Sequence, residues 1–349
     1  MSENSKIEWT DATFNPWEGC QKVGPGCDHC YAETRNARFS GGTATNWGPG
    51  APRRRTSAAN WRKPLAWNAR AFFQCNDCGR RGFGMPYLDV NPGTGGVLGD
   101  GHECEACGSR DMEPVDMRVF CASLADVFDN AVDPAWRRDL FELIARTPNL
   151  EWLLLTKRIG NARDMLNDVV DELSHGINTW DELPWPNVRL GATITNQPEA
   201  DRDISKLLAV PARGHFLSME PLLGPVTIPD VFLKPLLVDG RACFYPDGAG
   251  MVDWVIVGGE SGPCARPMHS DWARSLRDQC AAASVPFLFK QWGEWAPAPE
   301  VIAASGSLFH RFSDGAWMQR VGKRAAGRLL DGRTHDEYPA HAPCDPENH

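Results

Sequence analysis

The chain has 349 residues, of which 42% are hydrophobic, and its formal net charge is −9. This length is sufficient for one barrel-sized domain or for a main domain with a small insert, and the negative charge argues against a general nucleic-acid binder. No run of 18 apolar residues occurs and the N-terminus lacks the apolar core of a signal peptide, so we expect a cytoplasmic protein without membrane spans.

Three cysteines in one loop, Cys20, Cys27 and Cys30, follow an expected first strand near residues 13–15 and precede an expected helix. The chain has 12 cysteines, which in a reducing compartment are expected as metal ligands or core residues rather than as disulfides. Three thiolates on a short loop can hold three irons of a 4Fe–4S cluster and leave the fourth iron open. Half of a zinc site and a buried cysteine cluster are the alternatives.

The segment from residue 33 to residue 70 is locally basic, with eight arginines and lysines against one glutamate. Trp47, Trp61 and Trp67 lie among these cations. Basic and aromatic side chains together suit a phosphate backbone with stacked bases, which favours a nucleic acid or nucleotide as a partner. The alternative is a solvated face whose tryptophans pack inward.

Residues 74–115 contain two Cys-x2-Cys pairs, Cys75 with Cys78 and Cys104 with Cys107. Two such pairs supply four sulfur ligands in the pattern of a zinc ribbon, and an auxiliary iron–sulfur cluster is the alternative. The segment is rich in Gly and charge and shows neither helical nor strand periodicity, so we expect an inserted module that folds only with its metal.

From residue 116 the chain alternates short apolar strands with amphipathic helices. This alternation predicts an α/β fold with a parallel sheet, partly or completely closed into a TIM-like β/α barrel. The domains expected are an N-terminal part of the barrel at 1–73, the insert at 74–115, the rest of the barrel at 116–295 and an extension at 296–349. The expected strands are 117–122, 152–155, 188–192, 215–218, 254–257 and 286–289.

Polar side chains follow each of these strands, where the active site of a β/α barrel is built. Polar loops with helix-capping residues are the alternative interpretation. Charged residues directly after an apolar strand favour a functional pocket. The residues concerned are Ser123, Lys157, Arg158, Glu220, Gly258, Gly259, Glu260 and Lys290.

The cysteine loop, the Gly-Gly-Glu string and the barrel pattern together resemble the radical S-adenosylmethionine (SAM) enzymes. More closely, the chain resembles a phage-associated three-Cys-motif family of unknown function. The spacing differs from the usual radical-SAM loop, since it is Cys-x6-Cys-x2-Cys instead of Cys-x3-Cys-x2-Cys. The matching segments are IEWTDATFNP at 7–16, the cysteine loop, FCASLADVF at 120–128, LTKR at 155–158, SMEPL at 218–222, GGESG at 258–262 and KQWG at 290–293.

The resemblance implies an enzyme in which Cys20, Cys27 and Cys30 hold a 4Fe–4S cluster. One electron from the cluster would cleave SAM, and the resulting 5′-deoxyadenosyl radical would take a hydrogen atom from the substrate. Ser123, Glu220, Gly258, Gly259 and Glu260 are the expected SAM contacts. The candidate catalytic residues are Lys157, Glu220 and Lys290. Lys157, Arg158 and Lys290 are the expected contacts for an anionic substrate or for the SAM carboxylate.

The same resemblance implies a protein of the cytoplasm of a bacterium or of a phage-infected host cell. An electron-donor protein is expected as a partner, and a dedicated partner protein is a further expectation. Together with the basic segment, the resemblance suggests modification or repair of a nucleic acid or nucleotide.

Two other functions fit parts of the sequence. One is a barrel hydrolase in which Glu220 and Glu260 act as an acid/base pair. The other is a zinc-stabilised nucleic-acid-binding protein without catalysis. The first leaves the cysteine loop without a role, and the second leaves the charged strand ends without one.

Overall fold

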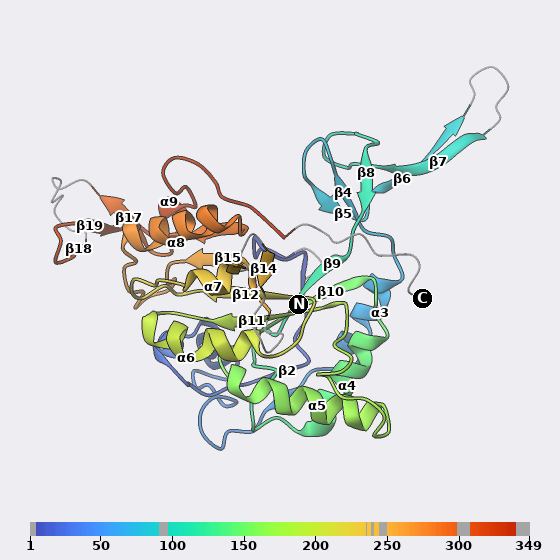
Figure 1. Ribbon diagram of the computed structural model, residues 1–349, viewed down its shortest axis with the longest axis horizontal. Coiled ribbons are helices and arrows are strands. Elements are labelled where there is room, and N and C mark those ends of the chain that lie inside the picture. Colours follow the sequence, from blue (N-terminus) through green and yellow to red (C-terminus); the bar gives the residue numbers. More distant parts are fainter. Residues whose placement is uncertain are drawn as a thin grey trace.

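A seven-stranded parallel sheet, curled into a half-barrel, forms the centre of the computed structural model (Figure 1). The structure describes residues 5–90, 97–234, 236–238, 241–243, 250–298 and 308–339. In spatial order the strands are β1 (Ala12–Thr13), β9 (Met117–Cys121), β10 (Leu150–Thr156), β11 (Val188–Thr193), β12 (Gly214–Met219), β15 (Val252–Gly258) and β16 (Phe287–Gln291).

The predicted α/β fold with a parallel sheet is confirmed. Of the two predicted forms, a partly or a completely closed barrel, the structure has the partly closed one. Each neighbouring pair of strands runs parallel, and β1 and β16 are the two edges of this sheet within the described residues. The near-continuous apolar runs give strands that are buried on both faces, as expected for a parallel sheet.

Four long helices connect successive strands and cover the outer face of the sheet. Asp133 caps the first of them through the N–H of Ala135, with Pro134 in the first turn. Asn196 and His269 cap two others. The four are α4 (Pro134–Ala145), α5 (Ala162–Leu173), α6 (Gln197–Leu208) and α8 (Ser270–Ala283).

Shorter helices lie in the connections and near both ends of the chain. None of the described helices has the length and apolarity needed to cross a membrane. The short helices are η1 (Pro25–Cys27), α1 (Tyr31–Phe39), α2 (Ala58–Trp61), α3 (Lys63–Asn68), η2 (Ile159–Asn161), α7 (Asp230–Leu233) and α9 (Lys323–Ala326).

The inner face of the half-barrel is filled by an aromatic cluster. Trp9, from the segment before β1, packs against Phe120 with ring centroids 4.6 Å apart and lies 6.0 Å from Phe216 and 6.3 Å from Trp254. At the amino-terminal ends of the strands, a buried ion-pair network lies below this cluster, in which Glu151 contacts Arg118 and Arg189. Polar side chains of the candidate site lie at the opposite, carboxyl ends of the strands.

A smaller module stands apart from the parallel sheet (Figure 1). Its three-stranded sheet consists of β4 (Phe73–Cys75), β5 (Arg81–Gly82) and β8 (Met112–Pro114). The hairpin of β6 (Met85–Val90) and β7 (Val97–Glu103) extends from it. Arg81 joins the module to the half-barrel by an ion pair of 3.0 Å with Asp11.

The remaining strands form three small antiparallel sheets. They are β2 (Trp17–Glu18) with β3 (Arg54–Arg55), β13 (Leu236–Val238) with β14 (Arg241–Cys243), and the C-terminal sheet of β17 (Trp295–Ala298), β18 (Phe309–Arg311) and β19 (Trp317–Arg320).

Candidate functional site

The cysteine loop lies over the carboxyl ends of the central strands. Gly26 shows how close the approach is, because a Cβ atom built there would come within 2.6 Å of Thr195 Cγ2 and 3.6 Å of Lys157 Cε. Lys157 directly follows β10, and Thr195 lies two residues beyond β11. A side chain at position 26 would therefore push the loop away from the strand ends.

The three thiols of the loop are held in different local structures. Cys27 is buried at the end of η1, Cys20 follows β2, and Cys30 is the N-cap residue of α1. Among the described residues, they do not form a group with all three sulfurs within 4.8 Å, as one metal ion would need. As they stand, the three thiols therefore do not form a ready-made mononuclear site, and a cluster would attach to each thiolate through a different iron.

Cys20 contacts a buried cation. Arg158 Nη1 lies 3.3 Å from Cys20 Sγ, and the other terminal nitrogen, Nη2, donates to the carbonyl of Gln21 at 2.9 Å. Asp126 pairs with Arg158 at 3.2 Å. Burial raises the pKa of the Cys20 thiol to about 11, although Arg158 acts in the opposite direction. Arg158, which it would share with Asp126, is thus the cation beside a thiolate ligand at this position.

Arg266 connects the cysteine loop to the Gly-Gly-Glu turn after β15. Its guanidinium donates to Glu260 through Nε at 2.8 Å and through Nη2 at 2.6 Å, and its backbone N–H donates to the same carboxylate at 2.8 Å. It also reaches the loop through the Pro25 carbonyl at 2.9 Å and Asp28 at 3.1 Å. We call Arg266 and Glu260 the loop clasp.

His29 completes the contact, because its Nδ1 lies 3.1 Å from Glu260 Oε2. Although burial opposes it, hydrogen bonds from Arg266 and His29 lower the pKa of Glu260. Both carboxylate oxygens of Glu260 are thus engaged by protein groups, and an ionised, fully bonded carboxylate is poorly suited to act as a general acid.

Packing against the backbone requires the glycine directly before Glu260. A Cβ atom at Gly259 would collide with the Trp292 carbonyl oxygen, whereas one at Gly258 would meet the end of the flexible Glu220 side chain. The close approach of the backbone therefore explains Gly259 by protein contacts alone. Gly258 and Glu220 lie close together because they are at the carboxyl ends of the neighbouring strands β15 and β12.

Two lysines stand among the strand ends with different partners. Lys290 pairs with Glu220 at 3.1 Å. Lys157 donates to the neutral hydroxyl of Thr193 at 3.3 Å, and no carboxylate among the described residues is paired with it. Ser123 lies nearer the first strand, where its carbonyl accepts from Tyr31 and its hydroxyl pairs with Asn15 at 2.9 Å. The site thus offers one half-buried ammonium for an anionic group.

The second cysteine group is a compact four-sulfur site. The Sγ atoms of Cys75, Cys78, Cys104 and Cys107 all lie within 4.8 Å of one another and could hold a metal ion. Two of the separations are 3.5 Å, between Cys78 and Cys104, and 3.7 Å, between Cys75 and Cys107. Hydrogen bonding from the Ala106 N–H contributes most to lowering the pKa of Cys104 to about 7, whereas, although the Ser109 N–H opposes it, the neighbouring thiol of Cys78 and burial raise the pKa of Cys107 to about 12.

The two halves of this site have the same backbone. Gly79 and Gly108 each follow the first cysteine of their pair by four residues, have φ of +71°, and donate to that cysteine's carbonyl at 2.8 Å. This left-handed conformation favours glycine. The matching turns present the sulfurs from opposite sides of the site.

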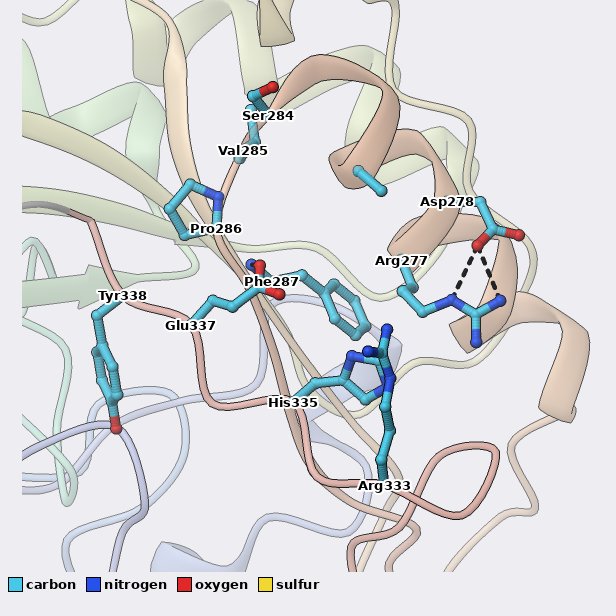
Figure 2. A pocket seen from close by; sticks show the side chains of 11 residues that line it. Arg277, Asp278, Ser284, Val285, Pro286, Phe287, Arg333, His335, Glu337 and Tyr338 are labelled. Carbon is cyan, nitrogen blue, oxygen red and sulfur yellow. Dashed lines mark hydrogen bonds and ion pairs between the residues drawn. The ribbon is translucent and has the colours of Figure 1, made fainter. Parts of the chain in front are cut away.

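A cavity of about 590 Å³ lies at the other end of the parallel sheet, around Phe287 at the start of β16 (Figure 2). Its lining is mixed in charge, with Arg277 and Arg333 as well as Asp278 and Glu337. Figure 2 shows Arg277 directed to Asp278 instead of into open space. This cavity is at the amino-terminal ends of the strands, remote from the cysteine loop.

The basic segment is largely neutralised by its own neighbours. Arg53 is buried against Asp129 at 2.8 Å, Arg54 and Arg35 pair with Glu18, and Arg55 pairs with Asp139. Trp67 is buried, whereas Trp47 and Trp61 are partly exposed. Trp61 nevertheless packs on the core, edge-on to the buried ring of Phe14 at 5.7 Å, so the inward packing of tryptophan holds for Trp61 and Trp67.

Sequence reasoning missed Arg266 and Tyr31, and it assigned Arg158 to an anionic ligand. Arg158 could be identified as a site residue because it follows a strand. Its contacts with Cys20 and Asp126 could not be predicted, because they form only when the loops fold together. Arg266 carries no local signal, since it lies in a loop 238 positions away from the Asp28 that it contacts. The curl of the sheet brings these segments together.

The comparisons with known proteins place almost the whole chain in one family. The model of the family described as "Protein of unknown function (DUF5131)" matches residues 4–339. No curated protein and no solved structure matches the chain. The match includes the cysteine loop, the four-cysteine module and every strand of the parallel sheet, and the chain belongs to the DUF5131 family.

Proposed function

We propose that the protein is a radical-SAM-type enzyme whose cysteine loop holds a 4Fe–4S cluster. The observation that carries the proposal is the position of three thiols, on one loop, at the carboxyl ends of a parallel half-barrel. The three sulfurs are not gathered as closely as one metal ion needs, and Cys20 has a buried guanidinium 3.3 Å away. When bound, the cluster would supply the electron that cleaves SAM and so generates the hydrogen-abstracting radical.

The residues of the chain would position these groups. The loop clasp and His29 hold the Cys27–Cys30 turn against the strand ends. Lys157 would bind an anionic group, either of SAM or of the substrate. The Lys290–Glu220 pair is the remaining candidate for a proton or hydrogen-bond contact to the substrate. The aromatic cluster below closes the inner face to water.

We propose zinc for the four-cysteine module. Tetrahedral geometry with Zn–S bonds of about 2.3 Å places the sulfurs about 3.8 Å apart, close to the separations of 3.5 and 3.7 Å. Four cysteines from two matching turns form a closed ligand set, which is typical of structural zinc. The metal would then stabilise the module and take no part in the reaction.

The substrate proposed is a nucleic acid or nucleotide. Arg38, Arg62 and Lys63 of the basic segment are exposed and are not among the ion pairs described above, whereas Arg70 packs over the ring of Phe83. The other four cations of the segment are paired with carboxylates of this chain. Binding of single-stranded DNA that weakens with salt, and that weakens further when Arg62 and Lys63 are replaced by Gln, would support the substrate class.

The hydrolase alternative has less support from the site. Glu260 is engaged by Arg266 and His29, and its pKa is lowered, which is opposite to what a general acid needs. No observation favours it over the cluster. We therefore retain it only as the function to test if no iron binds.

The test is the metal and sulfide content of protein purified without oxygen, followed by reconstitution with iron and sulfide. We expect about four irons and four sulfides in the loop site and one zinc per chain, with the iron lost in C20S, C27S and C30S. Adding SAM and a reductant should yield 5′-deoxyadenosine. Zinc alone after reconstitution would overturn the proposal.

A further inference from the structure

Arg158 occupies an unusual position for a buried arginine, because one of its nitrogens faces a sulfur. The distance from Nη1 to Cys20 Sγ is 3.3 Å, while Nη2 donates to the carbonyl of the next residue, Gln21. The side chain is 8% exposed. Asp126 is the ion-pair partner of this buried guanidinium, and Cys20 adds a second negative partner when it is a thiolate.

The orientation of Arg158 is fixed by a second set of contacts. Asp126 pairs with Arg158 at 3.2 Å and is itself held by the Thr156 hydroxyl at 2.7 Å and by the Lys157 N–H at 3.0 Å. Asp129 is 3.9 Å from Arg158, but Arg53 neutralises it at 2.8 Å. These buried contacts therefore fix the side-chain conformation in which the Arg158 guanidinium contacts Cys20.

We propose that Arg158 raises the reduction potential of the loop cluster through its hydrogen bond to Cys20, an inference that rests on the proposed function. Reduction adds one electron to the cluster and makes its sulfur ligands more negative. A donor and a positive charge beside a ligand sulfur stabilise the reduced form more than the oxidised form. Arg158 is thus a positioning residue that tunes the potential through Cys20.

The experiment is a redox titration of the reconstituted protein, with dithionite as the reductant through mediators and the reduced cluster followed by electron paramagnetic resonance. We compare the wild type with R158Q and R158K. R158Q removes the positive charge and the guanidinium that donates from two nitrogens, and R158K keeps the charge. R163Q is the matched control, because Arg163 is exposed on α5 and pairs with Asp181 instead of a cysteine.

We expect a lower midpoint potential in R158Q, a smaller decrease in R158K and no change in R163Q, each at wild-type iron content. An unchanged potential in R158Q with a full cluster would overturn the inference and leave the proposed function intact. Loss of the cluster from both Arg158 variants, with R163Q fully loaded, would also overturn it in favour of a structural role. Absence of a cluster from the wild type would instead overturn the proposed function.

Discussion

At the scale of single residues, the site is organised by arginines that hold acidic or sulfur partners from distant parts of the chain. Arg266 contacts Glu260, Asp28 and the Pro25 carbonyl, so one side chain joins two loops. Glu260 therefore holds the cysteine loop in place through its contacts with Arg266 and His29. Its loss would disturb the cysteine loop even if Glu260 never touches a ligand.

The clasp predicts a local effect that does not depend on any cluster. In iron-free protein, R266Q should increase hydrogen–deuterium exchange of the amides at 22–30 by about 10–100-fold, because charge-assisted hydrogen bonds contribute about 1.5–3 kcal/mol. R274Q is the control, since Arg274 is on α8 and pairs with Asp271 and Asp331. Equal exchange in R266Q and the wild type would show that the clasp does not hold the loop.

At the scale of elements, the sequence predicted the strands well because each is an apolar run covered on both faces. The expected strand at 188–192 corresponds to β11 (Val188–Thr193), and that at 215–218 to β12 (Gly214–Met219). The contacts of the cysteine loop were not predictable in this way. They link loops after β1 and β15, which lie far apart in the sheet order and meet only because the sheet curls.

The four-cysteine module has little of its own to keep it folded without metal. Its strands β4, β5 and β8 have two or three residues each, and within 72–84 and 101–115, where burial is described, the buried side chains are Phe72, Cys75 and Cys104. Metal binding is therefore expected to supply much of its folding free energy.

Removing the metal should then unfold the module alone. Treatment with a zinc chelator should raise hydrogen–deuterium exchange at 73–84 and 101–114 to near the unfolded rate and leave β9 and β10 protected. A variant with both Cys104 and Cys107 replaced by Ser should already show this exchange and should not respond to the chelator. Retained protection in the metal-free wild type would mean that packing, and not metal, holds the module.

At the scale of the whole molecule, the half-barrel separates two polar layers by the aromatic cluster around Trp9. The upper layer is the candidate site, and the lower layer is the ion-pair network of Arg118, Glu151 and Arg189. The lower layer touches no candidate ligand group. Its expected contribution is to the stability of the sheet, which can be tested independently of function.

Glu151 is the centre of that network and gives the last prediction. It is 2% exposed, lies 2.6 Å from Arg189 and 3.5 Å from Arg118, and, although burial opposes it, these cations lower its pKa from the usual 4.5. Replacing it with Gln removes the charge partner of Arg118 and one of the two carboxylate partners of Arg189, which keeps its pair with Asp253 at 2.7 Å, so E151Q should lose about 3 kcal/mol of unfolding free energy at pH 7. Chemical denaturation measures this loss, and E142Q is the control because Glu142 is exposed and pairs weakly with Arg146.

The pH dependence follows from the direction of the shift. Because the folded-state pKa of Glu151 lies below the unfolded value, its contribution is fully present above about pH 4.5 and is lost as the pH falls through the folded-state pKa. Acidification should therefore destabilise the wild type more than E151Q, and the difference between them should shrink. A difference that stays constant from pH 7 to below pH 4 would show that Glu151 contributes by packing and hydrogen bonding and not by its charge.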